Sequence, residues 1–196
     1  FATIFDDITE RKRAEKYREL SREILRILND FSDLGKAIRD IIALIRTNIE
    51  IDAVGLRLQE GEDFPYFIQE GFSQEFLMTE NSLHERDKDG NTYLGCTCGL
   101  VISGKTVPAN PLFTKGGSFW TNDSSSLLDL PPDQDRRLRP RNVCIHHGYA
   151  SIALIPLRNK GRIIGLLHLN SKSKGKFNLE TVEMLEAIAN DIGLAL

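Results

Sequence analysis

The chain has 196 residues, 41% hydrophobic and 27% charged, a balance typical of a soluble globular protein and not of a disordered or low-complexity chain. Its 25 Lys and Arg residues against 28 Asp and Glu give a net charge of −3, which disfavours nucleic-acid binding because that needs a basic surface. No apolar run is long enough to cross a bilayer, and the first residues do not read as a signal peptide. We therefore expect a cytoplasmic protein and, because the chain starts without Met, a piece of a longer one.

The first segment, residues 9–29, contains no Gly or Pro and is predicted to be a helix. Its apolar residues recur at spacings of three and four, as in an amphipathic or coiled-coil helix: Tyr17, Leu20, Ile24, Ile27 and Phe31. Two heptads are short for an isolated coiled coil, so the helix needs a partner. That partner is either its own domain or a second copy of the chain, and the pattern leaves both open.

The rest of the chain predicts an antiparallel sheet with helices. The expected order is a helix over about 33–48, strands over 53–59 and 64–70, a short helix over 72–79, an irregular insert over 81–141, strands over 149–157 and 162–170, and a helix from about 178. This is an α+β architecture, with the terminal helices on one face of the sheet and the insert over the other. The last helix has no stop signal at Leu196, so we expect it to run on into another domain.

The C-terminal half resembles a known family. The segments 148–151, 153–157 and 165–170 look like the last two core strands of a GAF domain, and the resemblance extends over residues 31–196. It implies a GAF-like sheet with a ligand pocket under the insert. The nucleotide-binding members carry an Asp-Glu pair where this chain has Thr181-Val182, which argues against cyclic nucleotide binding.

The start of the chain carries a second resemblance. Residues 5–15 look like the exit of a PAS domain's last strand into its signalling helix. Together the two resemblances imply a PAS-like end and linker over 1–30 and a GAF sensor domain over 31–196. They also imply a bacterial or archaeal two-component sensor, most commonly a histidine kinase, that dimerises through its terminal helices. A cyclic-dinucleotide enzyme is the other output that they allow.

Within GAF domains the chain resembles a subgroup found in sensor kinases. The residues that carry this are Cys96-x-Cys98-Gly99, 117–122, Arg139 with Arg141-Asn142 and Cys144, and Gly148-Tyr149. The histidine pair His146-His147 departs from that subgroup, so any role for it is peculiar to this chain.

The three cysteines are the strongest candidates for chemistry. An odd number without an export signal favours reduced thiols or metal ligands. Tetrahedral zinc takes three Cys and one His, and Cys96, Cys98, Cys144 and His146 supply that set, with His147 as the competing ligand. Haem is a variant of this metal hypothesis, although no Cys-x-x-Cys-His motif is present.

A thiol redox sensor is the second hypothesis, because the arginines before Cys144 would make nearby thiols more reactive. The third is that the cysteines are ordinary small core residues. Three further residues are candidates for lining a cofactor pocket: Phe119, Trp120 and His168. For His168, in the middle of an apolar strand, a hydrogen-bonded structural role is the more common one.

No phosphate loop, nucleophile elbow or metalloprotease motif is present, so we expect this fragment to be non-catalytic. The leading hypothesis is a sensory module that passes a ligand, metal or redox signal through dimeric helices to a kinase-type output. The rival is a structural dimerisation module without ligand. A weaker third is a thiol enzyme such as a methionine-sulfoxide reductase, a chemistry performed by some free-standing GAF proteins.

Overall fold

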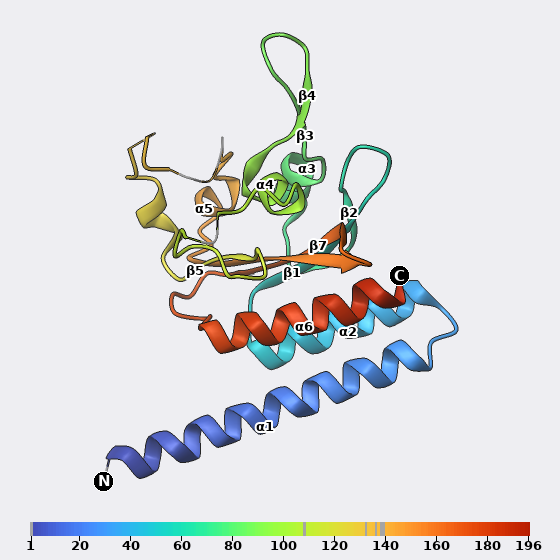
Figure 1. Ribbon diagram of the computed structural model, residues 1–196, viewed down its shortest axis with the longest axis vertical. Helices are drawn as coiled ribbons and strands as arrows, with labels where there is room; N and C mark the ends of the chain where they lie inside the picture. Colours follow the sequence, from blue (N-terminus) through green and yellow to red (C-terminus); the bar gives the residue numbers. More distant parts are fainter. Residues whose placement is uncertain (1, 108, 132, 136, 138–139) are drawn as a thin grey trace.

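The computed structural model describes residues 2–107, 109–131, 133–135, 137 and 140–196, and within these ranges the side chains of residue 12 and of residues 14 onward. A central sheet separates a layer of long helices from a layer of short elements (Figure 1). This is the α+β arrangement that the sequence predicts. No described helix is both long and apolar enough to span a membrane.

The long helices cover one face of the sheet, and their bounds are α1 Ala2–Asn29, α2 Leu34–Ile49 and α6 Leu179–Ala195 (Figure 1). Side-chain caps fix where two of them begin. Asp33 accepts a hydrogen bond from the backbone N–H of Lys36, and Asn178 accepts one from that of Thr181. The predicted stripe of α1 packs on its own domain, where Leu20 and Ile24 are buried.

Helix α1 includes residues that the PAS resemblance assigns to the end of a strand. A strand needs a neighbouring strand for its backbone hydrogen bonds, and the described residues offer none there, whereas a helix satisfies its own. Whether residues 1–30 belong to a separate PAS-like unit stays a prediction.

The sheet has five antiparallel strands in the order β2-β1-β7-β6-β5. Their bounds are β1 Ala53–Leu58, β2 Tyr66–Glu70, β5 Phe119–Thr121, β6 Ser151–Asn159 and β7 Arg162–Ser171. Strands β6 and β7 form the predicted hairpin. Its turn is tighter than predicted, because Lys160 and Gly161 both adopt positive φ and the strands run up to them.

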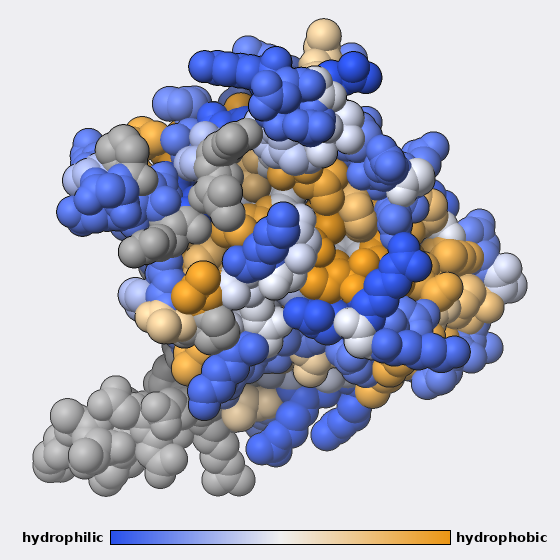
Figure 2. Space-filling view, turned by 45° about the horizontal axis from the view of Figure 1, so that its top comes forward, coloured by the Kyte–Doolittle hydropathy of each residue, from blue (hydrophilic) through white to orange (hydrophobic). Residues whose placement is uncertain are grey.

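The second layer is built from the insert. It comprises α3 Gln74–Glu80, the small hairpin β3 His84–Arg86 and β4 Thr92–Leu94, α4 Cys96–Ile102, the 3-10 helix η1 Ser124–Leu127 and α5 Val143–His146. Viewed toward this layer, the surface gathers apolar side chains in a hollow between polar segments (Figure 2).

Each face of the sheet has its own hydrophobic core, because successive side chains of a strand point to opposite faces. On β7, Leu167 and Leu169 face the long helices, whereas Leu166 packs in the core of the insert layer. His168, which lies between the two leucines, therefore points into the insert layer, whereas its spacing predicts only that it faces away from them. The cysteine-bearing elements lie in that same layer.

Candidate functional site

The three cysteines lie together on the insert face of the sheet, although Cys144 is far from the other two in sequence. Cys96 and Cys98 lie on α4 and Cys144 lies on α5, and all three are buried with free thiols. They line one narrow cavity of about 30 Å³, together with Phe119 and other residues of β5, η1 and β6. Proximity of the cysteines, which the sequence only suggests, is thus a property of the fold.

Cys96 differs from the other two cysteines in its backbone conformation and in the surroundings of its sulfur. Its φ of 62° lies in the left-handed region, which a residue with a side chain rarely adopts. The backbone N–H groups of Cys98 and Arg141 both donate to its sulfur. Hydrogen bonding from Cys98 is the largest cause that lowers the Cys96 pKa to about 5, and the Arg141 charge adds to it. The surroundings of Cys96 therefore favour its thiolate form.

The other two cysteines stay protonated. The hydrogen bond to Cys96, then burial, raise the pKa of Cys98 well above its usual range. Burial, then the negative charge on Cys96, raise the pKa of Cys144. The cavity is thus lined by one cysteine whose thiolate form is favoured and by two whose thiol form is favoured.

Cys144 has its own polar partner on the sheet. Its sulfur lies 3.6 Å from Nε2 of His168, and that nitrogen lies 3.0 Å from Oδ1 of Asn170. The other ring nitrogen, Nδ1, lies 2.8 Å from the hydroxyl of Tyr66. Burial, then the charge of Arg57, lower the His168 pKa to about 3, so the ring is neutral. His168 is a hydrogen-bonded core residue that also contacts the cysteine cluster.

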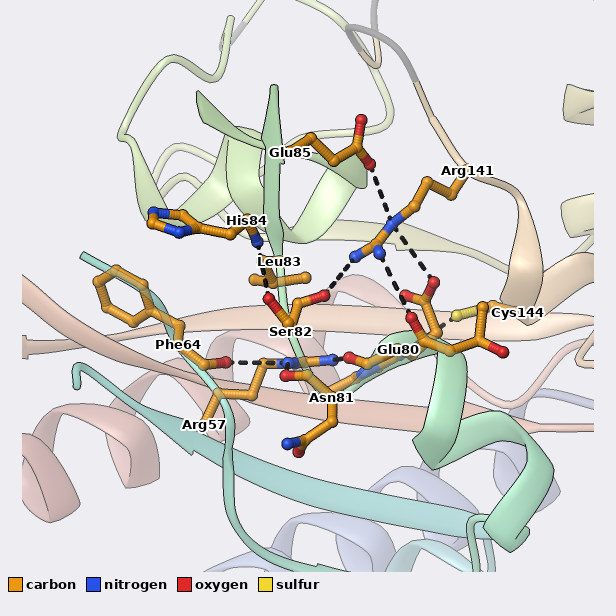
Figure 3. A network of polar contacts seen from close by, with 12 residues as sticks. Arg57, Phe64, Glu80, Asn81, Ser82, Leu83, His84, Glu85, Arg141 and Cys144 are labelled. Atoms are coloured by element: carbon orange, nitrogen blue, oxygen red, sulfur yellow. Dashed lines mark hydrogen bonds and ion pairs between the residues drawn. The ribbon is translucent and has the colours of Figure 1, made fainter. Parts of the chain in front are cut away.

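Arg141 connects the cysteines to the segment between α3 and β3. Its Nε lies 3.3 Å from Oε1 of Glu80 and 3.3 Å from Oε1 of Glu85. Its Nη2 donates to the carbonyl of Ser82 over 3.0 Å. Figure 3 shows the guanidinium between the two carboxylates. One side chain thus joins the approach to α5 with the end of α3 and with β3.

Glu80 is fully buried, and no residue that the structure describes donates a hydrogen bond to either of its carboxylate oxygens. Burial, then the nearby Cys96, raise its pKa to about 7, although Arg141 opposes that shift. Around neutral pH the Glu80 carboxyl therefore carries only part of its charge.

A second arginine supports the same segment from the sheet. Arg57 of β1 is fully buried and donates to the carbonyls of Phe64, Asn81 and Glu80 (Figure 3). Its guanidinium carbon lies 3.7 Å from the ring centroid of Tyr66. The segment from Thr79 to Ser82 is therefore held by one arginine on each side.

The predicted site residues separate into two groups. Cys96, Cys98, Cys144 and Phe119 line the cavity, and His168 contacts Cys144. Trp120 packs on the long-helix side, because it follows Phe119 in the strand and so faces the other way. His146 is exposed at the end of α5, and the neighbouring His147 packs edge-on against Phe76.

The predicted zinc set is not assembled in this arrangement. Among the described residues, no group of three or more His, Cys, Asp or Glu side chains is placed to hold a metal ion. His146 is exposed at the end of α5, whereas the three cysteines are buried. Zinc binding by Cys96, Cys98, Cys144 and His146 therefore stays a prediction.

Four polar residues of the site are not predicted from the sequence: Arg57, Tyr66, Glu80 and Glu85. None of the four gives a local signal, since even Arg57 stands at a position of an alternating strand where an exposed polar side chain is expected. Arg139 and Arg136, which belong to the predicted basic run, lie outside the described residues.

A comparison with protein families identifies the fold. The model of the GAF domain matches residues 33–196. The chain belongs to the GAF domain family. A comparison with curated proteins finds no match.

Solved structures agree with this GAF assignment. The GAF domain of a phosphoenolpyruvate-protein phosphotransferase from Coxiella burnetii is 14% identical with a TM-score of 0.66, covering 92% of each chain. Free methionine-R-sulfoxide reductase from Neisseria meningitidis, in complex with its substrate, is 16% identical with a TM-score of 0.61, covering 91% of this GAF chain and 87% of its own. A domain of a two-component sensor histidine kinase protein from Sinorhizobium meliloti is 14% identical with a TM-score of 0.54, covering 83% and 90%. At these identities the likeness concerns the fold alone.

Proposed function

We propose that this GAF domain is a redox-sensing module of a cytoplasmic signal-transduction protein. The observation that carries the proposal is that Cys96, Cys98 and Cys144 line one cavity, where hydrogen bonding from Cys98 lowers the Cys96 pKa. A thiolate is the nucleophilic form of cysteine, and a second thiol within hydrogen-bond reach can resolve its oxidised form to a disulfide. GAF domains are commonly sensory modules, which is consistent with this role.

Oxidation of the pair changes charge as well as covalent structure. The thiolate that accepts the Arg141 and Cys98 backbone N–H groups becomes a neutral disulfide sulfur. Arg141 then loses one of the groups that hold it, while it still bridges α3, β3 and the approach to α5. We expect these elements to shift relative to one another.

The sheet offers a path from the cysteines to the long helices. Helix α4 contacts β6 and β7, and α6 packs on β6 from the other face. The hydroxyl of Tyr17 on α1 lies 2.7 Å from that of Thr181 on α6. We propose that this path moves α1 against α6, and that a homodimer passes the change to a kinase-type output domain.

The test is a count of thiols after oxidation. The chain is treated with hydrogen peroxide, denatured, blocked and analysed by mass spectrometry. We expect the loss of two thiols and a disulfide between Cys96 and Cys98. Cys144→Ser should retain this disulfide, whereas Cys96→Ser and Cys98→Ser should lose it. Three thiols that survive in the folded wild type would refute the redox proposal and leave the structural dimerisation module standing.

Methionine-sulfoxide reduction is the second candidate function. It is favoured by the clustering of three cysteines on one cavity, together with the fold that this chain shares with free methionine-R-sulfoxide reductase. In that reaction the sulfoxide oxygen leaves as water, while two thiols become a disulfide and the sulfide is released. Incubation with free methionine-R-sulfoxide and dithiothreitol, followed by quantification of methionine, decides it. Turnover that Cys96→Ser abolishes would make the domain an enzyme.

A further inference from the structure

We propose that the oxidant sensed by Cys96 and Cys98 is a small hydroperoxide, in the first place hydrogen peroxide, admitted to the cavity between α4, α5 and β6. This inference rests on the proposed redox function and names its substrate class. It is carried by the size and lining of the cavity and by the position of the thiolate in its wall.

The size of the cavity sets the first limit. About 30 Å³ is available beside the three cysteines. A water molecule needs roughly 10–15 Å³ on the same measure, so the space holds a molecule of about two oxygen atoms. Hydrogen peroxide is of this size, whereas an aryl hydroperoxide is several times larger.

Buried hydrogen bonds and apolar packing hold the walls of the cavity, so widening the space costs free energy. Arg137 lines it, is buried, and donates through its guanidinium to Asp135, to Oδ1 of Asn142 and to the carbonyl of Leu127. The remaining wall is largely apolar core, including Phe119 and Leu154. Displacing either set would break buried hydrogen bonds or open a cavity in the core.

The chemistry in this space balances with the two thiols alone. The thiolate of Cys96 attacks one oxygen of hydrogen peroxide, the O–O bond breaks, and the leaving hydroxide takes up a proton to become water. Cys96 is then a sulfenic acid. The sulfur of Cys98 attacks it, the S–O bond breaks, and a second water leaves as the disulfide forms. Sulfur is oxidised, peroxide oxygen is reduced, and no further reactant is required.

The experiment compares two oxidants on the folded chain. Disulfide formation between Cys96 and Cys98 is followed by acid quenching and mass spectrometry, with hydrogen peroxide or cumene hydroperoxide at equal concentration. Each rate is divided by the rate at which the same oxidant reacts with the chain unfolded in guanidinium. This division cancels the difference in intrinsic reactivity between the two oxidants. We expect the normalised rate to be at least tenfold higher for hydrogen peroxide. Equal normalised rates would overturn the inference while leaving the redox function intact.

A cavity variant sharpens the test. Ile145 lines the cavity and is only partly buried, so Ile145→Ala widens the space with a modest loss of stability. We expect this variant to lower the ratio of the two normalised rates, hydrogen peroxide over cumene hydroperoxide, by a factor of three or more. The matched control is Ile164→Ala, which removes the same atoms from a partly buried residue on the long-helix face. An unchanged preference in Ile145→Ala would contradict the role of the cavity, and failure of both oxidants in the wild type would refute the redox function itself.

Discussion

Cys96 carries backbone strain at the centre of the site. Its φ of 62° places Cβ close to backbone atoms, which costs about 1–2 kcal/mol for a residue with a side chain. The surrounding hydrogen bonds to its sulfur hold it in place. A strained backbone at a reactive side chain is typical of functional sites.

This strain predicts an unusual order of stabilities. Cys96→Gly should be more stable than Cys96→Ala by about 1 kcal/mol, because glycine adopts positive φ without the Cβ conflict. Urea unfolding of both variants measures the difference. Equal midpoints, or a more stable alanine variant, would show that the position is not strained.

His168 makes the stability of the domain depend on pH. Its pKa is about 3 in the folded chain against an ordinary 6.5, so the unfolded chain binds the extra proton between these values. The contribution of His168 to the free energy of unfolding is therefore fully present above pH 6.5. It is lost as the pH falls toward 3, by about 1.4 kcal/mol per pH unit for this one proton.

His168→Gln should remove this contribution. The variant is expected to be less stable at pH 7 because it loses hydrogen bonds, yet to lose less stability between pH 6.5 and 4.5 than the wild type does. Urea midpoints across that range give the two slopes. Parallel slopes would mean that the imidazole is not held neutral.

At the scale of elements, Arg141 joins three segments of the insert layer with one planar group. It meets two carboxylates and also donates to the carbonyl of Ser82. A lysine ammonium keeps the charge but is a point donor that does not span these acceptors. We expect Arg141→Lys to lower the free energy of unfolding by about 1–3 kcal/mol, measured in urea. Arg162→Lys, at an exposed position, is the matched control, and a loss no larger than in this control would argue against the bridging role.

The position of α4 depends on a close backbone approach. A Cβ at Gly99 would lie 2.3 Å from the carbonyl oxygen of Leu94, which the backbone can relieve only by moving. Gly99→Ala should therefore displace α4 and slow the peroxide oxidation of Cys96 about tenfold, as followed by disulfide mapping. Gly35→Ala, near the start of α2, should leave the rate unchanged. An unaffected rate in Gly99→Ala would show that the placement of α4 does not set the reactivity.

For the whole molecule, local patterns predict the sheet and the long helices well. The alternation in β1 and β7, and the cap at Asp33, are each visible in a short stretch of sequence. These elements also settle which face His168 occupies.

The site is less predictable because it depends on long-range packing. Nothing local shows that Glu80 is buried, that Arg141 reaches it, or that Trp120 faces away from the cavity. The exposure of His146 is likewise not visible in the spacing of the cysteines and histidines.

The stripe of α1 shows the same limit of a local pattern. The buried residues of this stripe already pack in the core of the domain. A second copy of the chain would therefore have to bind another side of α1, such as the one around the exposed Leu25. If α1 transmits the signal, Arg22→Pro breaks its hydrogen bonding in the middle while residues 33–196 stay folded. We expect the full-length protein to lose its response with this change and to keep it with Arg22→Ala. A normal response in the proline variant would exclude α1 from the pathway.

The central claim is that Cys96 is held as a thiolate by Cys98 and by the backbone of Arg141. The ultraviolet absorbance of the thiolate tests this directly on the folded, reduced chain at pH 7, where an ordinary cysteine is protonated. We predict the absorbance of one thiolate in the wild type, its absence in Cys96→Ser, and a clear reduction in Cys98→Ala. A wild-type signal no greater than that of Cys96→Ser would contradict the account.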